Sequence, residues 1–454
     1  MKKFMLVLLY ISGIITSITA QTGKLFSTDN ELSNSLINTI FQDSRNFIWI
    51  ATEDGLNKYD GVKFTTYRND KNNPNSLKNN YVRSLFEDSK GRFWVGCVNG
   101  LMLYDRVNDS FSEIPLYYEN KIIEPHVSSI IETKKGDILI STSSDAILKY
   151  NSSKNCFIVD KQLLPKLCSK YIVSVFEDSE QNLWIASADK GVNRYNQLTK
   201  KNNLFKAPES LGNNQISSIN EDDCGNFFVG TLDGGLYILK KGQQKFEAVK
   251  YNNTSIKLPI KNLYFDKYNR LLIGTDGRGI KIYNKLNNRI EDFEIQTATF
   301  DFAHTKVHSI LLDKNGNLWI GLFQKGVFLS PNHTNKFKYW GSKSFKNNLI
   351  GSSCVMSLYY DNADVLWVGT DHDGIYAIDV FNNSQHYILY GNSTSLASTI
   401  MTIAEENENT LWLGSYLDGL IKFNKNNGSY TRFANTSTEF ANNPSSNRII
   451  NLLK

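Results

Sequence analysis

Neither basic nor acidic residues are in large excess in this sequence. It has 50 lysines and arginines against 45 aspartates and glutamates, a formal net charge of +5 over 454 residues. The basic residues come at most in short groups such as Lys134-Lys135, Lys200-Lys201 and Lys240-Lys241. Binding to a phosphate backbone needs a concentrated basic face. We therefore expect no nucleic acid partner.

Cysteine is also scarce, with five residues. They are odd in number and lack the CxxC spacing of zinc or redox sites, so we expect no metal and no cofactor. Cys156 and Cys168 are close enough in sequence to pair. The alternative is that the cysteines are small residues that fill the core or loops.

Long apolar runs are absent after the first 20 residues. Lys2 and Lys3 precede an apolar stretch at 4–18, and Ala20 before Gln21 is a small residue at a cleavage point. This pattern predicts a secretory signal peptide over residues 1–20. A signal anchor is the alternative, but 15 apolar residues are fewer than the roughly 20 that span a bilayer. We expect the mature chain in an extracytoplasmic space.

The composition is that of a soluble globular protein. Hydrophobic residues make up 41%, charged residues 21% and aromatic residues 12%, which excludes disordered, collagen-like and polytopic membrane classes. The length allows two to four domains or one large repeat architecture.

One short phrase recurs nine times, most clearly as Leu-Trp-Ile-Gly at 318–321, Leu-Trp-Val-Gly at 366–369 and Leu-Trp-Leu-Gly at 411–414. Successive copies are spaced by 45, 45, 45, 44, 44, 47, 48 and 45 residues. The second position of the phrase, here called the aromatic column, is always large and apolar. It holds Trp49, Trp94, Leu139, Trp184, Phe228, Leu272, Trp319, Trp367 and Trp412.

Two further columns precede the phrase. The Asp column lies six residues before the aromatic column and holds Asp43, Asp88, Thr133, Asp178, Asp222, Asp266, Asp313, Asp361 and Glu406. Four residues earlier a small polar residue stands in every copy, from Thr39 and Ser84 to Thr402. We interpret the aromatic and Asp columns as structural, and we expect the small polar residue on an innermost strand, where only small side chains fit.

Each repeat contains four strand-like runs broken by turn residues. In the second repeat they are 82–87, 92–97, 101–104 and a weaker run at 110–114, and the Asp-Ser-Lys-Gly stretch at 88–91 has hairpin chemistry. Four antiparallel strands per 44–48 residues is the size of a β-propeller blade. The sequence therefore predicts an all-β propeller with four-stranded blades, in which the aromatic column fills the space between diverging sheets.

Nine repeats are complete, and residues 449–452 open a tenth. We expect a seven-bladed propeller over residues 21–345, with the first blades of a second, incomplete propeller over 346–454. The run at 24–28 resembles an outer strand without a blade of its own and is expected to close a ring by completing another blade. On this interpretation the sequence is truncated.

The phrase Trp-Ile-Ala-Thr-Glu-Asp-Gly-Leu-Asn-Lys-Tyr-Asp at 49–60 closely resembles the two-component regulator propeller repeat. That repeat builds the periplasmic sensor half of hybrid two-component proteins and related sensor histidine kinases, and the likeness covers residues 24–454. In the family about fourteen repeats form two seven-bladed propellers, followed by a linker domain, a transmembrane helix and a kinase. This chain contains none of those later parts.

The resemblance implies a periplasmic ligand-sensing module that acts in a phosphorelay. Modules of this kind commonly sense oligosaccharides, and a homodimer is a possible assembly. It implies membrane attachment only through the missing C-terminal parts and no kinase chemistry in these residues. The runner-up is a secreted carbohydrate-active propeller enzyme, a glycosidase or lyase, and a third alternative is a stand-alone interaction module. A propeller fold by itself excludes none of these.

Ligand contacts are expected in the loop between the second and third strands of each blade. This loop varies from repeat to repeat, and variable loops on a constant scaffold usually carry specificity. Sugars need planar donors and acceptors and an aromatic face for the ring. The candidates are Asp276, Arg278, Phe323, Gln324, Lys325, Asp371, His372, Asp373 and Tyr416, with Trp340 in a long connector. Each could also be an ordinary solvated loop residue.

No catalytic motif is recognisable. Asp371 and Asp373 flank His372, but Asp-rich turns recur throughout the chain, and the carboxylate separation that a glycosidase needs cannot be read from sequence. His304 and His308 are four residues apart without the rest of an HExxH motif, so a zinc site is not expected.

Overall fold

The computed structural model describes residues 23–453 apart from 30, 146, 253, 255, 296–299, 333–339, 341–348, 380–383, 388–398 and 436–445, and of 384–387 only the backbone. Within this part the chain is all-β, and its helical content is the 3-10 turn η1 (Leu164–Lys166). None of the described helices has the length and hydropathy needed to cross a membrane. The expected signal peptide over 1–20 lies outside the described residues.

The chain divides into two compact units. The first unit contains residues 23–296 and 301–334, and the second contains 335–454. The domain boundary expected near residue 345 falls outside the described residues.

Seven four-stranded arrays, here called blades 1 to 7, make up the first unit, and the strands of each are antiparallel. Their strands are, for blade 1, β2 (Ile37–Gln42), β3 (Ile48–Thr52), β4 (Gly55–Tyr59) and β5 (Phe64–Tyr67); for blade 2, β6 (Val82–Glu87), β7 (Phe93–Cys97), β8 (Gly100–Asp105) and β9 (Ser110–Ile114); for blade 3, β12 (Val127–Glu132), β13 (Ile138–Thr142), β14 (Ile147–Asn151) and β15 (Cys156–Val159); for blade 4, β16 (Ile172–Glu177), β17 (Asn182–Ser187), β18 (Val192–Asn196) and β19 (Asn202–Phe205). They are, for blade 5, β20 (Ile216–Glu221), β21 (Phe227–Thr231), β22 (Gly235–Leu239) and β23 (Glu247–Tyr251); for blade 6, β24 (Ile260–Phe265), β25 (Leu271–Thr275), β26 (Ile280–Asn284) and β27 (Arg289–Asp292); and for blade 7, β28 (Val307–Leu312), β29 (Leu318–Leu322), β30 (Gly326–Ser330) and β1 (Lys24–Phe26).

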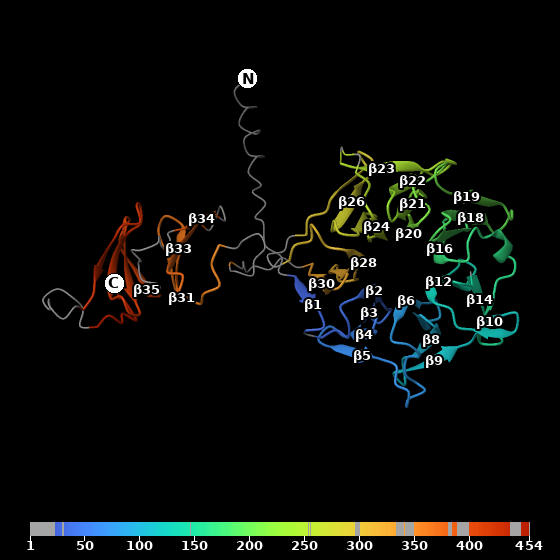
Figure 1. The fold of residues 1–454 in the computed structure, drawn as a ribbon, viewed down its shortest axis with the longest axis horizontal. Helices are drawn as coiled ribbons and strands as arrows, with labels where there is room; N and C mark the ends of the chain where they lie inside the picture. The colour runs from blue at the N-terminus through green and yellow to red at the C-terminus, as the bar shows by residue number, and fades with distance from the viewer. Residues whose placement is uncertain are drawn as a thin grey trace, which may run out of the picture. The chain divides into compact units, whose positions relative to one another are not determined.

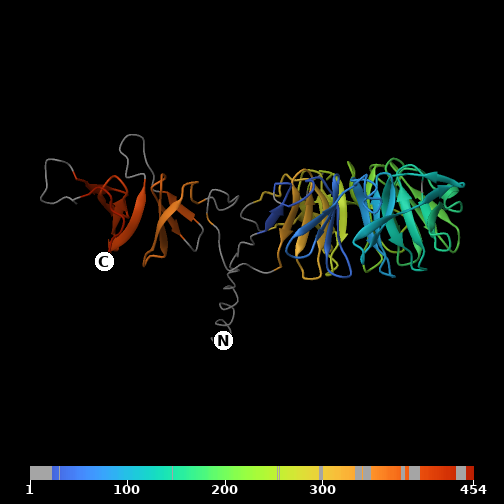
Figure 2. The ribbon, with the colours of Figure 1, turned by 90° about the horizontal axis from the view of Figure 1, so that it is seen from below.

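The blades stand radially around a central axis with the first strand of each repeat innermost, as Figure 1 shows, and Figure 2 shows the same ring from the side with loops on both faces. Two parallel pairings add to the blades. A short hairpin of β10 (Leu116–Tyr118) and β11 (Lys121–Ile123) extends blade 3 through β15, and β23 pairs with β27 to join blades 5 and 6. The expected all-β propeller of four-stranded blades is confirmed.

The ring closes through the N-terminal strand. β1 pairs antiparallel with β30, with Lys24 opposite Leu329 and Phe26 opposite Val327. Phe26 is fully buried and stacks on Trp319 at 6.0 Å between ring centroids. This confirms that the segment at 24–28 supplies an outer strand to another blade. Closure of this kind removes an exposed sheet edge.

The aromatic column fills the gaps between neighbouring blades. Trp49 of blade 1 lies 4.7 Å from Phe93 and 4.9 Å from Tyr104 of blade 2, between ring centroids. Trp184 of blade 4 stacks on Phe227 of blade 5 at 3.8 Å. The wide rings bury apolar area where the sheets diverge, which is the physical reason for the recurring Trp.

The Asp column fixes these tryptophans by hydrogen bonds. The indole N–H donates to the aspartate six residues earlier, with distances of 3.0 Å (Trp49–Asp43), 2.9 Å (Trp94–Asp88), 2.7 Å (Trp184–Asp178), 2.9 Å (Trp319–Asp313) and 2.8 Å (Trp367–Asp361). The other oxygen of Asp43 accepts the backbone N–H groups of Arg45 and Phe47, so one carboxylate holds both the hairpin and the indole. Trp412 lacks this partner because Glu406 replaces the aspartate and instead pairs with Lys422 at 2.8 Å.

A buried cation joins blades 1 and 2 at the same place. The Arg106 guanidinium donates to Asp43 at 2.7 Å and to Glu87 at 2.8 Å, and its side chain is 12% exposed. Charge-assisted hydrogen bonds of this kind are about twice as strong as neutral ones. The Asp column therefore also carries an ion pair between blades.

The small polar column links innermost strands, as its expected position requires. Ser309 accepts a hydrogen bond from the Ile40 amide at 3.0 Å, and Ser84 donates to the Val127 carbonyl at 3.1 Å. The Gly of the phrase leaves room for the next inner strand, because a Cβ on Gly321 would lie 2.8 Å from the Ile37 side chain. Small residues at both positions let the inner strands approach closely.

The second unit contains two further four-stranded sheets, β31 (Val355–Tyr360), β32 (Val365–Thr370), β33 (Ile375–Asp379) and β34 (Ser384–Tyr387), and β35 (Ile400–Asn407), β36 (Thr410–Ser415), β37 (Leu420–Asn424) and β38 (Tyr430–Phe433). Ile449 lies against Gly414, and its amide donates to the Ser415 carbonyl at 2.9 Å. This is the contact that the next inner strand makes in the first unit.

The second unit repeats the buried ion pair. Lys425 donates to Asp361 at 2.9 Å and to Glu405 at 2.5 Å. Burial alone would raise the pKa of Asp361, but the hydrogen bonds from Trp367 and Lys425 outweigh it and lower this pKa. The hydrogen bond from Lys425 lowers the pKa of Glu405 as well.

The five cysteines are free thiols. Cys97 and Cys156 are buried, Cys168 is partly buried, and Cys224 and Cys354 are exposed. Cys156 and Cys168 are therefore not paired in this structure. Burial raises the pKa of Cys97 to about 12.

Candidate functional site

The loop between the second and third strands of each blade is held at the start of the inner strand. Its first residue donates its amide to the carbonyl just before the inner strand, at 3.1 Å from Val98 to Tyr81, 2.9 Å from Asp276 to Pro259 and 3.0 Å from Phe323 to Lys306. The residues before the inner strand, at its second position and at the start of this loop form one end of the ring, here called the mouth.

The residues of the mouth differ from blade to blade. Those just before the inner strands are Leu36, Tyr81, His126, Tyr171, Gln215, Pro259 and Lys306. Those at the second position are Asn38, Arg83, Ser128, Val173, Ser217, Lys261 and His308. The loops begin with Glu53, Val98, Ser143, Ala188, Leu232, Asp276 and Phe323. Charged groups belong to blades 1, 2, 6 and 7, whereas blades 4 and 5 supply neutral residues.

Blades 6 and 7 join an acid, two cations and an aromatic ring. Lys306 lies 2.9 Å from Asp276, and Lys261 lies 3.7 Å from the same carboxylate. The Lys306 ammonium also lies 5.4 Å from the centroid of Phe323, and the His308 ring lies 5.1 Å from Phe323. Burial would raise the pKa of Asp276, but the two lysines lower it, so the group is a carboxylate at neutral pH.

His308 is electrostatically linked to a blade that is not its neighbour. Burial, together with the positive charges of Lys261 and Arg83, lowers the pKa of His308 to about 4. Arg83 belongs to blade 2 and donates to Asn38 of blade 1 at 3.3 Å, whereas His308 belongs to blade 7. Both residues hold the second position of their inner strands, and His308 is neutral at pH 7.

Blades 2 and 3 add a second aromatic group. The Tyr81 and His126 rings meet edge to face at 5.9 Å between centroids. The His126 Nε2 atom is buried and has no hydrogen-bond partner among the described residues. Burial lowers the pKa of His126, and Arg83 adds to the effect, so this imidazole is also neutral at pH 7.

The mouth thus combines aromatic faces with planar donors and an ionised carboxylate, which is the chemistry that holds a polar ligand rich in hydroxyl groups. Of the residues predicted from sequence, Asp276 and Phe323 belong to it. Tyr81, Arg83, His126, Lys261 and Lys306 were not singled out, and His308 was considered only as a metal ligand. The signal that could have found them is the variation at the two positions flanking the first aliphatic residue of each repeat.

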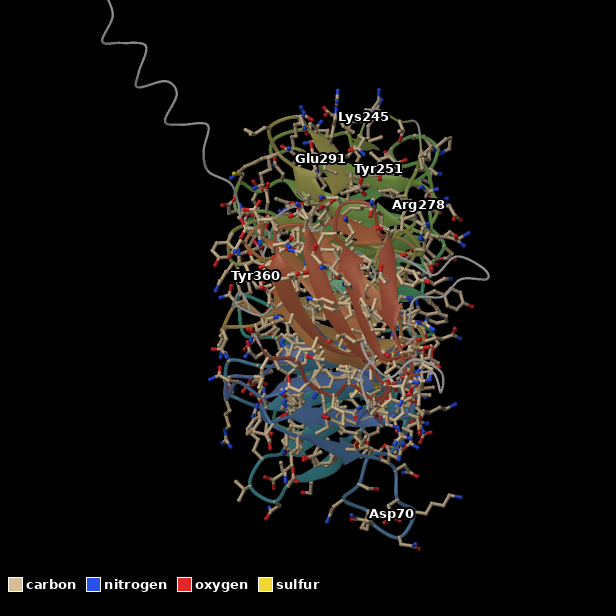
Figure 3. All side chains as sticks on the ribbon, turned by 90° about the vertical axis from the view of Figure 1, so that its left-hand side faces the viewer. Asp70, Lys245, Tyr251, Arg278, Glu291 and Tyr360 are labelled. Atoms are coloured by element: carbon tan, nitrogen blue, oxygen red, sulfur yellow. The ribbon has the colours of Figure 1, made fainter. Side chains whose placement is uncertain are left out.

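The other candidates of the first unit lie farther along the same loops. The Arg278 amide donates to Thr275 at 3.0 Å, and its guanidinium lies close enough to Tyr251 to affect its ionisation. Figure 3 shows Arg278 and Tyr251 near one another. Gln324 adopts a positive φ of 59° in an exposed turn, and Lys325 is also exposed. All three follow the first residue of their loops by one or two positions, toward the third strand of the blade.

In the second unit, Thr399 joins two of the candidates. Its hydroxyl lies 3.4 Å from an Asp371 carboxylate oxygen, and its carbonyl accepts the Tyr416 amide at 3.3 Å. Asp371, Thr399 and Tyr416 stand where Asp276, Lys306 and Phe323 stand in blades 6 and 7. Two adjacent blades of this unit therefore repeat the acid and aromatic pair.

The remaining candidates of the second unit differ in exposure. His372 is 78% exposed and lies 3.5 Å from Asp371. The Asp373 amide donates to Thr370 at 3.0 Å, which closes the loop. Trp340 packs against the buried cluster of Ile350, Val368, Tyr376 and Ile378, so its ring covers the sheet.

One group in the described part of the chain has metal-ligand composition, Asp222, Asp223 and Cys224. Asp222 is buried and the other two residues are exposed, and Lys285 lies 3.5 Å from Asp222 and 3.6 Å from Asp223. The lysine neutralises the carboxylates, and hairpin aspartates recur in the Asp column. We therefore assign no metal site to this group.

Three segments of the chain, residues 31–54, 76–99 and 301–324, match the family model of the two component regulator propeller. These are two-component regulator propeller repeats. The match confirms the resemblance inferred from the recurring phrase. Each segment runs from the residues before an inner strand to the loop that begins the mouth, so the repeat signature spans the structural columns described above. A search of curated proteins gives no match.

Solved structures share the fold. The extracellular domain of BT3049 from B. thetaiotaomicron, a protein named as a hybrid two component system, is 23% identical with a TM-score of 0.65 over 92% of this chain. The extracellular domain of BT4673 from B. thetaiotaomicron, named as a one component system, is 18% identical with a TM-score of 0.54 over 91% of this chain. The chain spans 55% and 54% of those two structures.

A propeller enzyme is similar over about two thirds of the chain. Virginiamycin B lyase from Staphylococcus aureus is 16% identical, with a TM-score of 0.52 over 68% of this chain and 98% of the lyase. At these identities the likenesses establish the fold, and the fold is shared by sensors and enzymes.

Proposed function

We propose that this chain is the extracytoplasmic ligand-binding part of a two-component sensor, and that its ligand is an oligosaccharide. The observation that carries the proposal is the match of three segments to the two component regulator propeller. The resemblance to the extracellular domains of BT3049 and BT4673 supports the same location for this chain, with export by the basic and apolar segment at 1–20. We propose the periplasm as its compartment and a homodimer as its assembly.

The mouth of the first unit is the proposed ligand site. Phe323 and Tyr81 offer ring faces to the C–H surface of a sugar, while Asp276, Arg83 and Lys306 offer charged partners for hydroxyl groups. Neutral His308 adds a donor and an acceptor on one ring. A ligand that bridges blades 2 and 7 would contact residues distant in sequence, so binding would respond to the arrangement of the whole ring.

Signalling requires that the ligand bind one arrangement of the sensor more tightly than another, since equal affinity for both shifts nothing. The repeat of the acid and aromatic pair at Asp371 and Tyr416 gives the second unit a comparable surface. We propose that each unit has a ligand-binding surface of its own.

The test is a thermal-shift screen of the full chain against plant, host and microbial oligosaccharides, with product analysis of each mixture. We expect one glycan class to raise the melting temperature without turnover. Phe323→Ala and Arg83→Ala should each weaken that binding about tenfold, or about 1.4 kcal/mol. Arg45→Ala, an exposed arginine in the hairpin at the other end of blade 1, is the matched control and should bind as the wild type does.

Turnover of the glycan would contradict the sensor proposal and favour the alternative of a carbohydrate-active propeller enzyme. Binding that survives both mouth variants would place the site elsewhere. A panel with no binding at all would contradict oligosaccharide recognition by this chain.

A further inference from the structure

Blade 3 departs from the other blades in both structural columns. Leu139 stands in place of the tryptophan and Thr133 in place of the aspartate that would hold it. The neighbouring positions in blade 4 are also smaller, since Leu183 occupies the place that Phe93 has in blade 2. Two aromatic rings that pack between blades 1 and 2 are therefore missing between blades 3 and 4.

A cavity of about 180 Å³ occupies this gap, lined by Thr133, Leu139, Leu183 and Tyr195 among others. The next gap offers a direct comparison, because Trp184 and Phe227 are present there. The cavity at that place measures about 40 Å³. The difference follows from the missing indole and phenyl rings.

The floor and rim of this cavity, here called the blade 3–4 pocket, have different chemistry. Leu139, Leu183 and Tyr195 are each at most 4% exposed and form an apolar floor. Lys135, Lys149 and Lys200 belong to the lining and are exposed. A more open depression of about 600 Å³ shares Lys149, Asp160 and Gln162 with the pocket and leads outward along blade 3.

The cations of the rim are only partly neutralised. Lys149 pairs with Asp137 at 2.7 Å. The second carboxylate of the lining, Asp160, accepts the backbone amides of Gln162 and Leu163 at 2.8 and 3.1 Å. Lys135 and Lys200 have no carboxylate partner among the described residues, although Lys200 lies 6.0 Å from the Tyr195 ring centroid. The rim therefore offers two ammonium groups to an anion.

We propose that the blade 3–4 pocket binds a ring-sized carboxylate, with the ring on the apolar floor and the carboxylate between Lys135 and Lys200. An apolar cavity of about 150 Å³ holds a benzene ring, so 180 Å³ suits one substituted six-membered ring. Most of the lining is polar or charged, and the apolar part includes the floor of Leu139, Leu183 and Tyr195. An apolar surface beside convergent polar groups is typical of ligand sites. This site is separate from the mouth and does not depend on the function proposed there.

The experiment is isothermal titration calorimetry of the full chain with glucuronate, galacturonate and benzoate, with glucose as the uncharged ring. We expect at least one of the three acids to bind and glucose to bind at least about tenfold more weakly, since charge-assisted hydrogen bonds are lost. Binding of the uronates alone identifies the ring as a sugar acid, and binding of benzoate alone identifies it as an aromatic acid. Binding of all three acids supports a site that recognises the carboxylate and the ring without further selection.

Three variants locate the binding. Lys135→Ala and Lys200→Ala should each weaken it about tenfold, and Leu139→Trp should abolish it by restoring the ring that fills the gap. The matched control is Lys90→Ala, because Lys90 holds the same hairpin position in blade 2, where Trp94 is present. Phe323→Ala should leave this binding unchanged, which separates it from the mouth.

If Leu139→Trp does not fold, the two lysine variants carry the test. The proposal is overturned if none of the acids binds, if glucose binds as tightly as glucuronate, or if both lysine variants bind as Lys90→Ala does. Loss of binding in Phe323→Ala with no loss in the lysine variants would assign the acid to the mouth and would also overturn it.

Discussion

The ion pair between blades 1 and 2 makes Asp43 more important for stability than an aspartate of the same column without a cation. One oxygen of Asp43 accepts from the Trp49 indole at 3.0 Å and from Arg106 at 2.7 Å. The corresponding oxygen of Asp313 accepts from the Trp319 indole at 2.9 Å and from the Asn317 amide at 2.9 Å. Replacement of either aspartate by asparagine keeps the shape and removes the charge.

The magnitude follows from what each substitution leaves unpaired. In Asp313→Asn one buried indole donor loses its partner. The Asn317 amide also faces the new NH₂ group, and turning it would release the Asn332 amide that its oxygen accepts at 3.0 Å, so we expect a total cost of about 1–3 kcal/mol. In Asp43→Asn the same donor is lost and Arg106, 12% exposed, is left with Glu87 alone. Breaking a buried pair costs about 3–5 kcal/mol, and the remaining Glu87 contact places this case near the lower end. We expect Asp43→Asn to be less stable than Asp313→Asn by about 1–2 kcal/mol.

The assay is urea denaturation of the full chain followed by circular dichroism, with a thermal melt as a second measure. Arg106→Met, alone and combined with Asp43→Asn, completes a double-mutant cycle. We expect a coupling energy above about 1 kcal/mol between the two side chains, within the usual range for residues in one network. Equal destabilisation in Asp43→Asn and Asp313→Asn, with a coupling energy below about 0.5 kcal/mol, would refute the argument that the buried cation stabilises the blade interface.

Three further outcomes are expected. Phe26→Ala should destabilise the propeller by about 3–5 kcal/mol in the same denaturation assay, because the closing strand loses its buried phenyl group. Leu286→Ala removes a side chain that is 99% exposed and should change stability by less than about 0.5 kcal/mol. Lys425→Met should change the pH dependence of unfolding. In the wild type the two carboxyls that contact Lys425 have lowered pKa values, so their stabilisation is present at neutral pH and is lost as pH falls below about 4. The variant should be less stable at pH 7 and should lose less stability on acidification than the wild type does. Thiol titration with a chromogenic disulfide should modify the exposed Cys224 rapidly and Cys97 only after unfolding, because burial raises the pKa of Cys97 to about 12. Rapid modification of Cys97 in the folded protein would contradict its buried position.

The structural columns could be predicted from sequence because the hydrogen bond from the indole to the aspartate recurs in blades 1, 2, 4 and 7 and in the second unit. Trp49 and Trp184 meet different aromatic partners, yet both donate to an aspartate six residues earlier. A constant spacing and a constant residue type follow from that repeated geometry. The closing strand was also predictable, since the run at 24–28 has strand character and no blade of its own.

The mouth could not be predicted in the same way, because its residues share a position and not a type. Arg83 and His308 occupy corresponding places in blades 2 and 7, and nothing in a single repeat indicates that these places belong to a ligand site. The sequence pattern indicates the small polar residues that recur in each inner strand, whereas the positions of the proposed ligand site are the variable ones beside them. Trp340 illustrates the opposite case, since a tryptophan outside the aromatic column suggested a ligand contact but packs on the second unit's sheet.

The departures of blade 3 were visible in sequence, but their consequence was not. Leu139 and Thr133 break both columns, and a smaller residue leaves a cavity only if its neighbours do not move in. Leu183 and Tyr195 belong to strands of the next blade and line the cavity without filling it. Cavity volume is a property of residues about 45 positions apart, so no local pattern encodes it.

The arrangement of the repeat separates stability from recognition. Hydrogen bonds donated to Asp43 and its equivalents fix the hairpins and the indoles, while the mouth residues stand at the other end of the same inner strands. A substitution such as Phe323→Ala should therefore change ligand binding with little effect on the stability of the ring, and Asp313→Asn should do the reverse. Blade 3 is the exception that the geometry allows. In blade 3 both structural columns are altered, and the blade is held by its neighbours on both sides. The cavity that results between blades 3 and 4 is the proposed site of a second ligand.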